Sequence, residues 1–173
     1  MKKTRSFSKV LANQCITRRA AIGLGATAVL DLWLVVLKRL GVPTGSFALI
    51  GRWVAHMARG QFSHASIAKA EPARHELAIG WITHYLVGMA FAAVLVVPQG
   101  SNWVRQPTFV PAFLTGLATV AMPLFVMQPA MGLGFAASKT PTPLKNCARS
   151  LANHAVFGIG LYLAAIVAAG LIR

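Results

Sequence analysis

The chain has 173 residues, of which 56% are hydrophobic and only 12% are charged. A soluble domain of this size usually carries about 25% charged residues, so the composition indicates one domain whose solvent is lipid. The net charge of +14 would suit a nucleic-acid partner in a soluble protein. Here the bases flank apolar runs and no nucleic-acid motif is present, so we expect contacts with membrane lipids, including anionic headgroups, and no nucleic acid.

The first elements are a basic segment and an apolar run. Residues 1–18 are predicted to form a disordered basic tail, so that a single transmembrane domain occupies residues 19–173. The first span covers roughly residues 20–37 and ends at Lys38. Its start, Thr17-Arg18-Arg19, is similar to a twin-arginine signal, and Ala26-Thr27-Ala28 is similar to a cleavage site. We favour an uncleaved helix, because the apolar run continues well past Ala28.

The connector over residues 41–76 is too long for a simple turn. Within it, residues 46–60 place apolar side chains on one helical face and Arg52, His56 and Arg59 on the other. This pattern predicts an amphipathic helix in the headgroup region, with Trp53 as an interfacial anchor. Glu71 and Glu76 lie near Arg74 and His75 in the same connector, where we expect a solvated charge cluster.

Three further apolar runs are long enough to cross a bilayer. They cover roughly residues 77–97, 108–127 and 151–172. The fold class is therefore an all-α integral membrane protein with four transmembrane helices and an interfacial helix between the first two. The connector over residues 128–150 mixes Gly, Pro and apolar residues, so it could dip into the membrane edge where protein or a wet cavity covers it.

The charge distribution gives almost no preference for orientation. The N-terminal segment, the second loop and the C-terminus carry eight bases, and the first and third loops with their flanks carry nine. The first helix often dominates, which favours a cytoplasmic N-terminus. We call the membrane side that carries the first and third loops face B.

Four polar residues from four different spans are predicted to share one depth. Asp31 lies seven residues before Lys38, so it sits roughly 10 Å below face B at the helical rise. His84, Gln128 and His154 fall near the same depth on the other spans. Ionisable groups inside a bilayer are costly and usually turn inward, so we predict a polar layer with His84 and His154 as partners of Asp31.

Further polar residues reach this layer from the face-B connectors. They are Arg52, His56, His64, Ser138, Lys139 and Thr140. If a metal is bound, Asp31, His84 and His154 are its expected ligands. No motif of fixed spacing indicates a metal or another cofactor, and no phosphate loop or GxSxG motif indicates an enzyme.

The two halves of the chain show a short similarity. Ala26-Thr27-x3-Asp31 matches Ala118-Thr119-x3-Pro123, and His84-x3-Gly88 matches His154-x3-Gly158. A 2+2 repeat of helix pairs, as known in transporters, would explain it. Chance similarity between apolar helices explains it as well. In either case Pro123 predicts a kink in the third span.

Several short motifs together resemble a known family. They are DLW at 31–33, GRW at 51–53, His84-Tyr85, MQPAMG at 127–132 and FGIGLY at 157–162. The chain resembles the small bacterial inner-membrane proteins of domain-of-unknown-function family 2938, from about residue 23 to residue 163. The resemblance implies a multi-pass protein of the bacterial inner membrane and brings no activity, substrate or catalytic residue.

The sequence favours a structural, assembly or regulatory protein, in which the buried polar groups would only fix helix packing. Two alternatives stay open. In a transporter for a proton or small solute, Asp31 would carry the proton with His84 and His154 as relays. In a metal- or haem-binding protein, the histidines would be ligands. A dry, close-packed layer favours the first function, and a wet or metal-filled pocket favours one of the others.

Overall fold

The computed structural model describes residues 2–171, and every regular element among them is a helix. The elements are α1 (Lys2–Arg39), α2 (Phe47–Met57), η1 (Ile67–Lys69), α3 (Glu76–Arg105), α4 (Phe109–Ala118), η2 (Pro123–Met127), α5 (Gln128–Ala130), η3 (Phe135–Ala137) and α6 (Pro143–Gly170). Four segments are long and apolar enough to cross a membrane: Thr17–Arg39, Glu76–Gly100, Phe109–Ala130 and Pro143–Gly170. This confirms the predicted fold class of four transmembrane helices.

Two helices begin earlier than the hydropathy pattern indicates. α1 is helical from Lys2, where the sequence predicts a disordered tail over residues 1–18. No Gly or Pro interrupts the chain before Gly23, so nothing breaks the helix between the basic segment and the span. α6 begins at Pro143 rather than near residue 151, because proline suits the first helical position while the polar residues after it hide the helix from a hydropathy search.

The third span is irregular at the predicted kink. α4 ends at Ala118, and the chain resumes as a π-helix over Pro123–Met127. Pro123 has no backbone N–H, so it cannot bond the carbonyl of Thr119, and the N–H of Met122 bonds that carbonyl instead at 3.1 Å. The wider turn continues to Gln128, whose N–H bonds the carbonyl of Pro123. The kink at Pro123 is therefore a break in the regular series of backbone hydrogen bonds of the third span.

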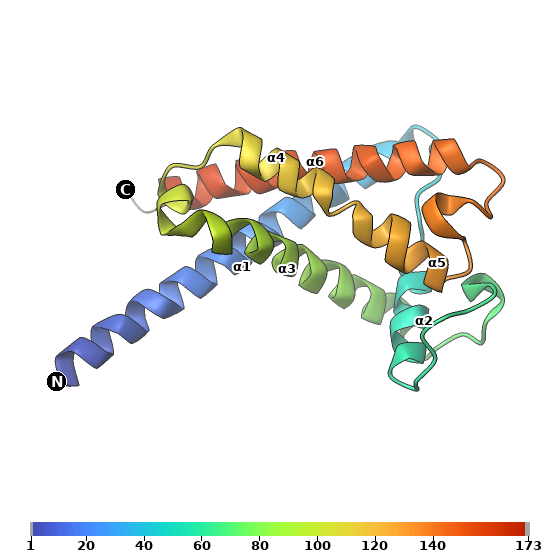
Figure 1. The fold of residues 1–173 in the computed structure, drawn as a ribbon, viewed down its shortest axis with the longest axis horizontal. Helices are drawn as coiled ribbons and strands as arrows, with labels where there is room; N and C mark the ends of the chain where they lie inside the picture. Colours follow the sequence, from blue (N-terminus) through green and yellow to red (C-terminus); the bar gives the residue numbers. More distant parts are fainter. Residues whose placement is uncertain (1, 172–173) are drawn as a thin grey trace.

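The spans pack in the order α3, α1, α6, α4, and close helix crossings hold them together (Figure 1). At the α1–α3 crossing, a Cβ on Gly88 would overlap the Thr27 hydroxyl, and at the α4–α6 crossing a Cβ on Gly116 would overlap the backbone of Gly158. Gly88 and Gly158 are the matched positions of the possible repeat. Each of the two helix pairs therefore uses the equivalent glycine at its crossing, which supports the 2+2 arrangement.

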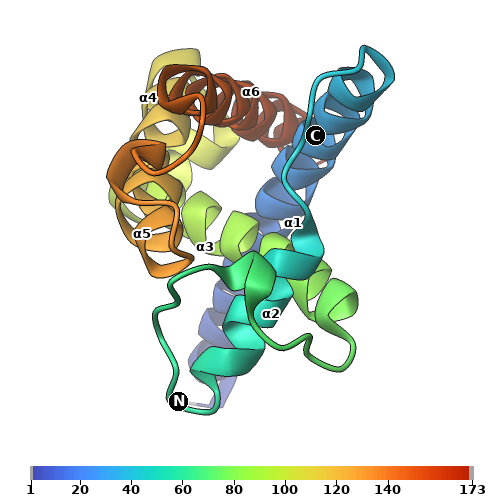
Figure 2. The same cartoon turned by 90° about the vertical axis from the view of Figure 1, so that its right-hand side faces the viewer.

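The main cluster of buried apolar side chains lies at one end of the bundle. It contains Leu95, Val96, Trp103, Ala112 and Leu161, among others, and includes residues on both sides of the short loop between α3 and α4. Toward face B, the near end of α3 and the α5 segment lie on opposite sides of the bundle (Figure 2). In the same view α6 lies at the top, α5 at the left and α2 with its loop at the bottom. This arrangement leaves room for a pocket in the face-B half.

Candidate functional site

Asp31 pairs with two neighbouring side chains of α3. Its Oδ1 lies 2.9 Å from Nε2 of His84, and its Oδ2 accepts a hydrogen bond of 2.8 Å from the hydroxyl of Tyr85. The side chains of Asp31 and His84 are 18% and 15% exposed. A carboxylate in an apolar bundle therefore has a donor for each oxygen, as a group that is costly to bury requires.

His154 belongs to a separate pair. Its Nδ1 lies 2.8 Å from Oγ1 of Thr119, and that hydroxyl donates to the carbonyl of Gly116 at 2.6 Å. Gln128 is 8% exposed, and its Oε1 is buried without a hydrogen-bond partner among the described residues. The four predicted residues thus do not form one network: Asp31 and His84 bond each other, while His154 and Gln128 lie apart from that bond.

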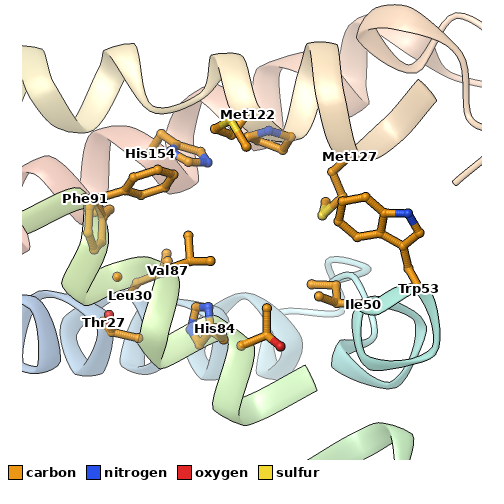
Figure 3. A pocket seen from close by; sticks show the side chains of 14 residues that line it. Thr27, Leu30, Ile50, Trp53, His84, Val87, Phe91, Met122, Met127 and His154 are labelled. Atoms are coloured by element: carbon orange, nitrogen blue, oxygen red, sulfur yellow. The ribbon is translucent and has the colours of Figure 1, made fainter. Parts of the chain in front are cut away.

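A pocket of about 200 Å³ joins the two histidines. Figure 3 shows His154 and His84 on opposite walls, with Phe91 at one end and Trp53 and Met127 at the other. The lining is mostly apolar and comprises Thr27, Leu30, Ile50, Trp53, Thr83, His84, Val87, Gly88, Phe91, Met122, Pro123, Met127, His154 and Phe157. Val87 and Met122 are also 40% and 46% exposed, so the pocket reaches the outer surface of the bundle.

The α2 helix forms one wall of the pocket, and its polar face points into the protein. Arg52 is 9% exposed and His56 is 5% exposed. Arg52 holds Glu76 with two hydrogen bonds of 2.8 and 2.9 Å and donates to the carbonyls of Ile67, Ala68 and Ala70. Hydrogen bonding to Glu76 raises the pKa of Arg52 above its usual value, so the guanidinium stays charged.

This geometry corrects two expectations. Two residues of the predicted polar face, Arg52 and His56, turn into the protein, because the chain after the helix folds back and supplies Glu76 and three carbonyls to Arg52; Arg59 stays exposed. Glu76 is not part of a solvated cluster with Arg74 and His75. It pairs with Arg52 and also accepts a bond of 3.0 Å from the N–H of Ala73.

The α2 and α3 helices touch backbone to backbone. A Cβ on Gly80 would overlap the carbonyl of Phe47, and a Cβ on Gly51 would overlap that of Glu76. The same approach packs the ring of Phe47 against that of His84, with centroids 4.5 Å apart and the ring planes tilted by 41°. The close contact therefore sets both the α2 wall of the pocket and the orientation of His84.

The loop after α2 crosses the open end of the bundle to reach α5. Nδ1 of His56 lies 2.8 Å from Nε2 of His64, whose backbone N–H donates to Ala130 at 2.8 Å. The N–H of Ile67 donates to Met131 at 3.0 Å. These bonds connect α2 to the third span on the face-B side of the pocket.

The other predicted face-B contributors lie away from the pocket. Ser138 and Lys139 are exposed near the start of α6, and Thr140 bonds the carbonyl of Ala137 and the side chain of Asn146. Within residues 2–171, no group of three or more His, Cys, Asp and Glu side chains could hold a metal ion. Asp31, His84 and His154 therefore do not converge as a ligand set.

Sequence reasoning missed three residues that organise the site. Each of them forms a hydrogen bond with a residue that the sequence predicted to be important. The pairs are Tyr85 with Asp31, Thr119 with His154, and Glu76 with Arg52. Tyr85 directly follows His84, and Thr119 aligns with Thr27 in the possible repeat. The sequence positions of these two residues could therefore have indicated a role in the site. The position of Glu76 gave no such indication, because its partner Arg52 lies across a long irregular loop.

Comparison with known proteins gives a family and nothing further. No curated protein and no solved structure matches the chain. Residues 20–168 match the family described as "Protein of unknown function (DUF2938)". This range covers most of the chain and includes Asp31, both pocket histidines and the Arg52–Glu76 pair, so the chain belongs to that family.

Proposed function

We propose that this multi-pass membrane protein binds a small, mainly apolar molecule in the pocket between its four spans. The observation that carries the proposal is the partly open pocket of about 200 Å³, which both intramembrane histidines line. A cavity of about 150 Å³ holds benzene, so this pocket suits a molecule with one or two fused rings or a short branched chain. Such a protein would act as a carrier or sensor of a small solute.

The pocket favours binding over a purely structural or assembly role. Protein interiors are usually close-packed, and side chains that line a space lose the dispersion contacts that a packed neighbour would supply. A protein selected only for close packing gains nothing from a space of about 200 Å³ beside the Asp31–His84 pair. We infer that an occupant fills it in the membrane.

A second candidate function is proton-linked transport of the same solute. It is favoured by the contact between Asp31 and His84, because His84 also lines the pocket. A proton bound by Asp31 and His84 would change the charge of one pocket wall. His154 would act separately on the opposite wall. Metal or haem binding has no equivalent support, since the three expected ligands do not converge.

The proposed location is the inner membrane of a bacterium. Basic residues flank the apolar spans on both sides, including Lys38 and Arg39 after the first span and Arg105 after the second. Such flanks favour a membrane with anionic headgroups. Fractionation of a bacterial host that expresses the chain tests the location, and recovery outside the inner membrane would contradict it.

Filling the pocket tests the binding function. The protein in lipid nanodiscs is titrated with 2-naphthol, 2-methylnaphthalene and 2-methoxynaphthalene, and partition into empty nanodiscs is subtracted. We expect saturable binding by wild-type protein and at least a tenfold loss in Leu30→Trp, whose new ring enters the pocket. Leu32→Trp is the matched control, because Leu32 lies on the same helix, is 68% exposed and does not line the pocket.

A second variant that fills the pocket keeps the test valid if Leu30→Trp fails to fold. Val87→Trp places the ring on the α3 wall, where part of the residue already faces outward. Thermal unfolding of all three variants shows which of them fold. If no probe binds wild-type protein saturably, or if a folded filling variant binds like wild type, the proposed function is wrong.

A further inference from the structure

The hydrogen-bond pattern around Thr119 determines which nitrogen of His154 carries the proton. A threonine hydroxyl has one hydrogen, and Thr119 gives it to the carbonyl of Gly116 at 2.6 Å. At its 2.8 Å contact with His154, the hydroxyl oxygen must therefore accept from Nδ1–H. A neutral imidazole has one N–H, so Nε2 of His154 is a bare acceptor.

Asp31 imposes the complementary tautomer on His84. A carboxylate only accepts hydrogen bonds, so Nε2 of His84 is the donor in their 2.9 Å contact. Tyr85 supplies the second donor to the same carboxylate. In the neutral ring, Nδ1 of His84 is then also a bare acceptor.

Two of the donors in the pocket lining are already used by the protein. The Thr27 hydroxyl donates to the carbonyl of Gly23 at 2.8 Å, and the Trp53 indole donates to the carbonyl of Phe62 at 2.9 Å. Thr83 contributes one hydroxyl, which both donates and accepts. The polar character of the walls is therefore dominated by two acceptor nitrogens in otherwise apolar surroundings.

We propose that the pocket selects ligands that donate hydrogen bonds: mainly apolar alcohols or phenols, whose hydroxyl groups bond Nε2 of His154 and Nδ1 of His84. Ethers and ketones of the same size offer only acceptors to these nitrogens. Carboxylates would place a second negative charge beside Asp31. This inference rests on the proposed function and specifies its ligand class.

The three naphthalene probes test the selection directly, because they differ in one substituent. In wild-type protein we expect 2-naphthol to bind about three- to tenfold more tightly than 2-methoxynaphthalene or 2-methylnaphthalene, after correction for partition into empty nanodiscs. This is the range that one neutral hydrogen bond supplies. Equal binding of the three probes, or tighter binding of the ether, overturns the inference and leaves the proposed function intact.

Substitution of His154 assigns the selection to its wall. His154→Phe removes the acceptor and keeps a ring of similar size, and Thr119 still has its bond to Gly116. We expect the ratio of naphthol affinity to methyl-probe affinity to fall toward the value that His84 alone sustains. Leu163→Phe, on the same helix as His154, changes a 45% exposed side chain outside the pocket lining and keeps the preference; loss of the preference in this control instead contradicts the assignment.

A spectroscopic measurement tests the tautomers without any ligand. Nitrogen-15 NMR of histidine-labelled protein distinguishes protonated from bare ring nitrogens. We expect a protonated Nδ1 and a bare Nε2 for His154, and the reverse for His84. A protonated Nε2 on His154 overturns the inference even if the probes bind, and failure of all three probes to bind overturns the proposed function instead.

Discussion

Arg52 on α2 and Glu76 at the start of α3 are joined by two parallel hydrogen bonds, Nε to Oε2 at 2.8 Å and Nη2 to Oε1 at 2.9 Å. The same guanidinium donates to the carbonyls of Ile67 and Ala70 in the intervening loop. One side chain thus connects α2, the loop and α3. Since Ile50 and Trp53 of α2 line the pocket, this ion pair holds one of the pocket walls in place.

Removal of Arg52 should destabilise the protein strongly. Arg52→Ala leaves Glu76 without its main partner and frees the loop carbonyls, so we expect a loss of about 3 kcal/mol, at the lower end for a broken buried pair because Glu76 is partly exposed. Arg52→Lys should recover only part of the lost unfolding free energy, since an ammonium group cannot form both parallel hydrogen bonds with the carboxylate. Reversible unfolding in mixed detergent micelles measures the difference.

Arg59→Ala is the matched control for Arg52. Arg59 lies two turns further along the same segment and is exposed, so its removal should change the unfolding free energy by less than about 0.5 kcal/mol. Equal effects of the two substitutions would show that the Arg52–Glu76 pair does not hold α2.

The contact between α2 and α3 makes a second prediction. Gly80→Ala introduces a methyl group that would overlap the carbonyl of Phe47, and backbone cannot yield as a flexible side chain can. We expect α2 to shift away from α3, with lower thermal stability and weaker binding of all naphthalene probes. Gly45→Ala, just before α2, meets no atom within 4 Å and should leave both unchanged. Normal stability and binding in Gly80→Ala would contradict the close approach.

The fold was largely predictable, because the length of an apolar run is enough to identify a transmembrane span in the sequence. The spans predicted at residues 77–97 and 108–127 lie within Glu76–Gly100 and close to Phe109–Ala130. The early starts of α1 and α6 were missed for one reason: helical residues outside the lipid carry polar side chains, to which a hydropathy search is blind. Pro123 did predict the break in the third span, because a missing N–H is a local property of the sequence.

The site was predictable only where the depth of a residue follows from its position along a helix whose start is known. Counting residues from Lys38 and from residue 77 correctly placed Asp31 beside His84. For His154 the count began at residue 151, although α6 begins at Pro143, and its partner proved to be Thr119. The inward polar face of α2 could not be predicted, because it depends on a loop that returns Glu76 to Arg52, and amphipathicity does not say whether a polar face meets water or protein.

The bonds of Asp31 make a third prediction, which separates loss of charge from loss of hydrogen bonds. Asp31→Leu leaves the N–H of His84 and the hydroxyl of Tyr85 without acceptors in an apolar bundle, so we expect a loss of about 2 kcal/mol or more. Asp31→Asn should cost about 1 kcal/mol or less, because its carbonyl accepts from His84 while its amide donates to the Tyr85 oxygen. Unfolding free energies measure both, and a similar loss in both variants would mean that charge, rather than bonding, stabilises the site.

The bond between Thr119 and His154 makes the last prediction. Thr119→Val has nearly the same shape and lacks the hydroxyl that accepts from Nδ1, so the His154 proton is free to move to Nε2. We expect mixed tautomers in the nitrogen-15 spectrum and a weaker preference for 2-naphthol over 2-methoxynaphthalene. Thr119→Ser retains a hydroxyl that donates to Gly116 and accepts from His154, so it should restore both the single tautomer and the preference. If Thr119→Val keeps the wild-type tautomer and selectivity, then the hydroxyl does not set the acceptor that faces the pocket.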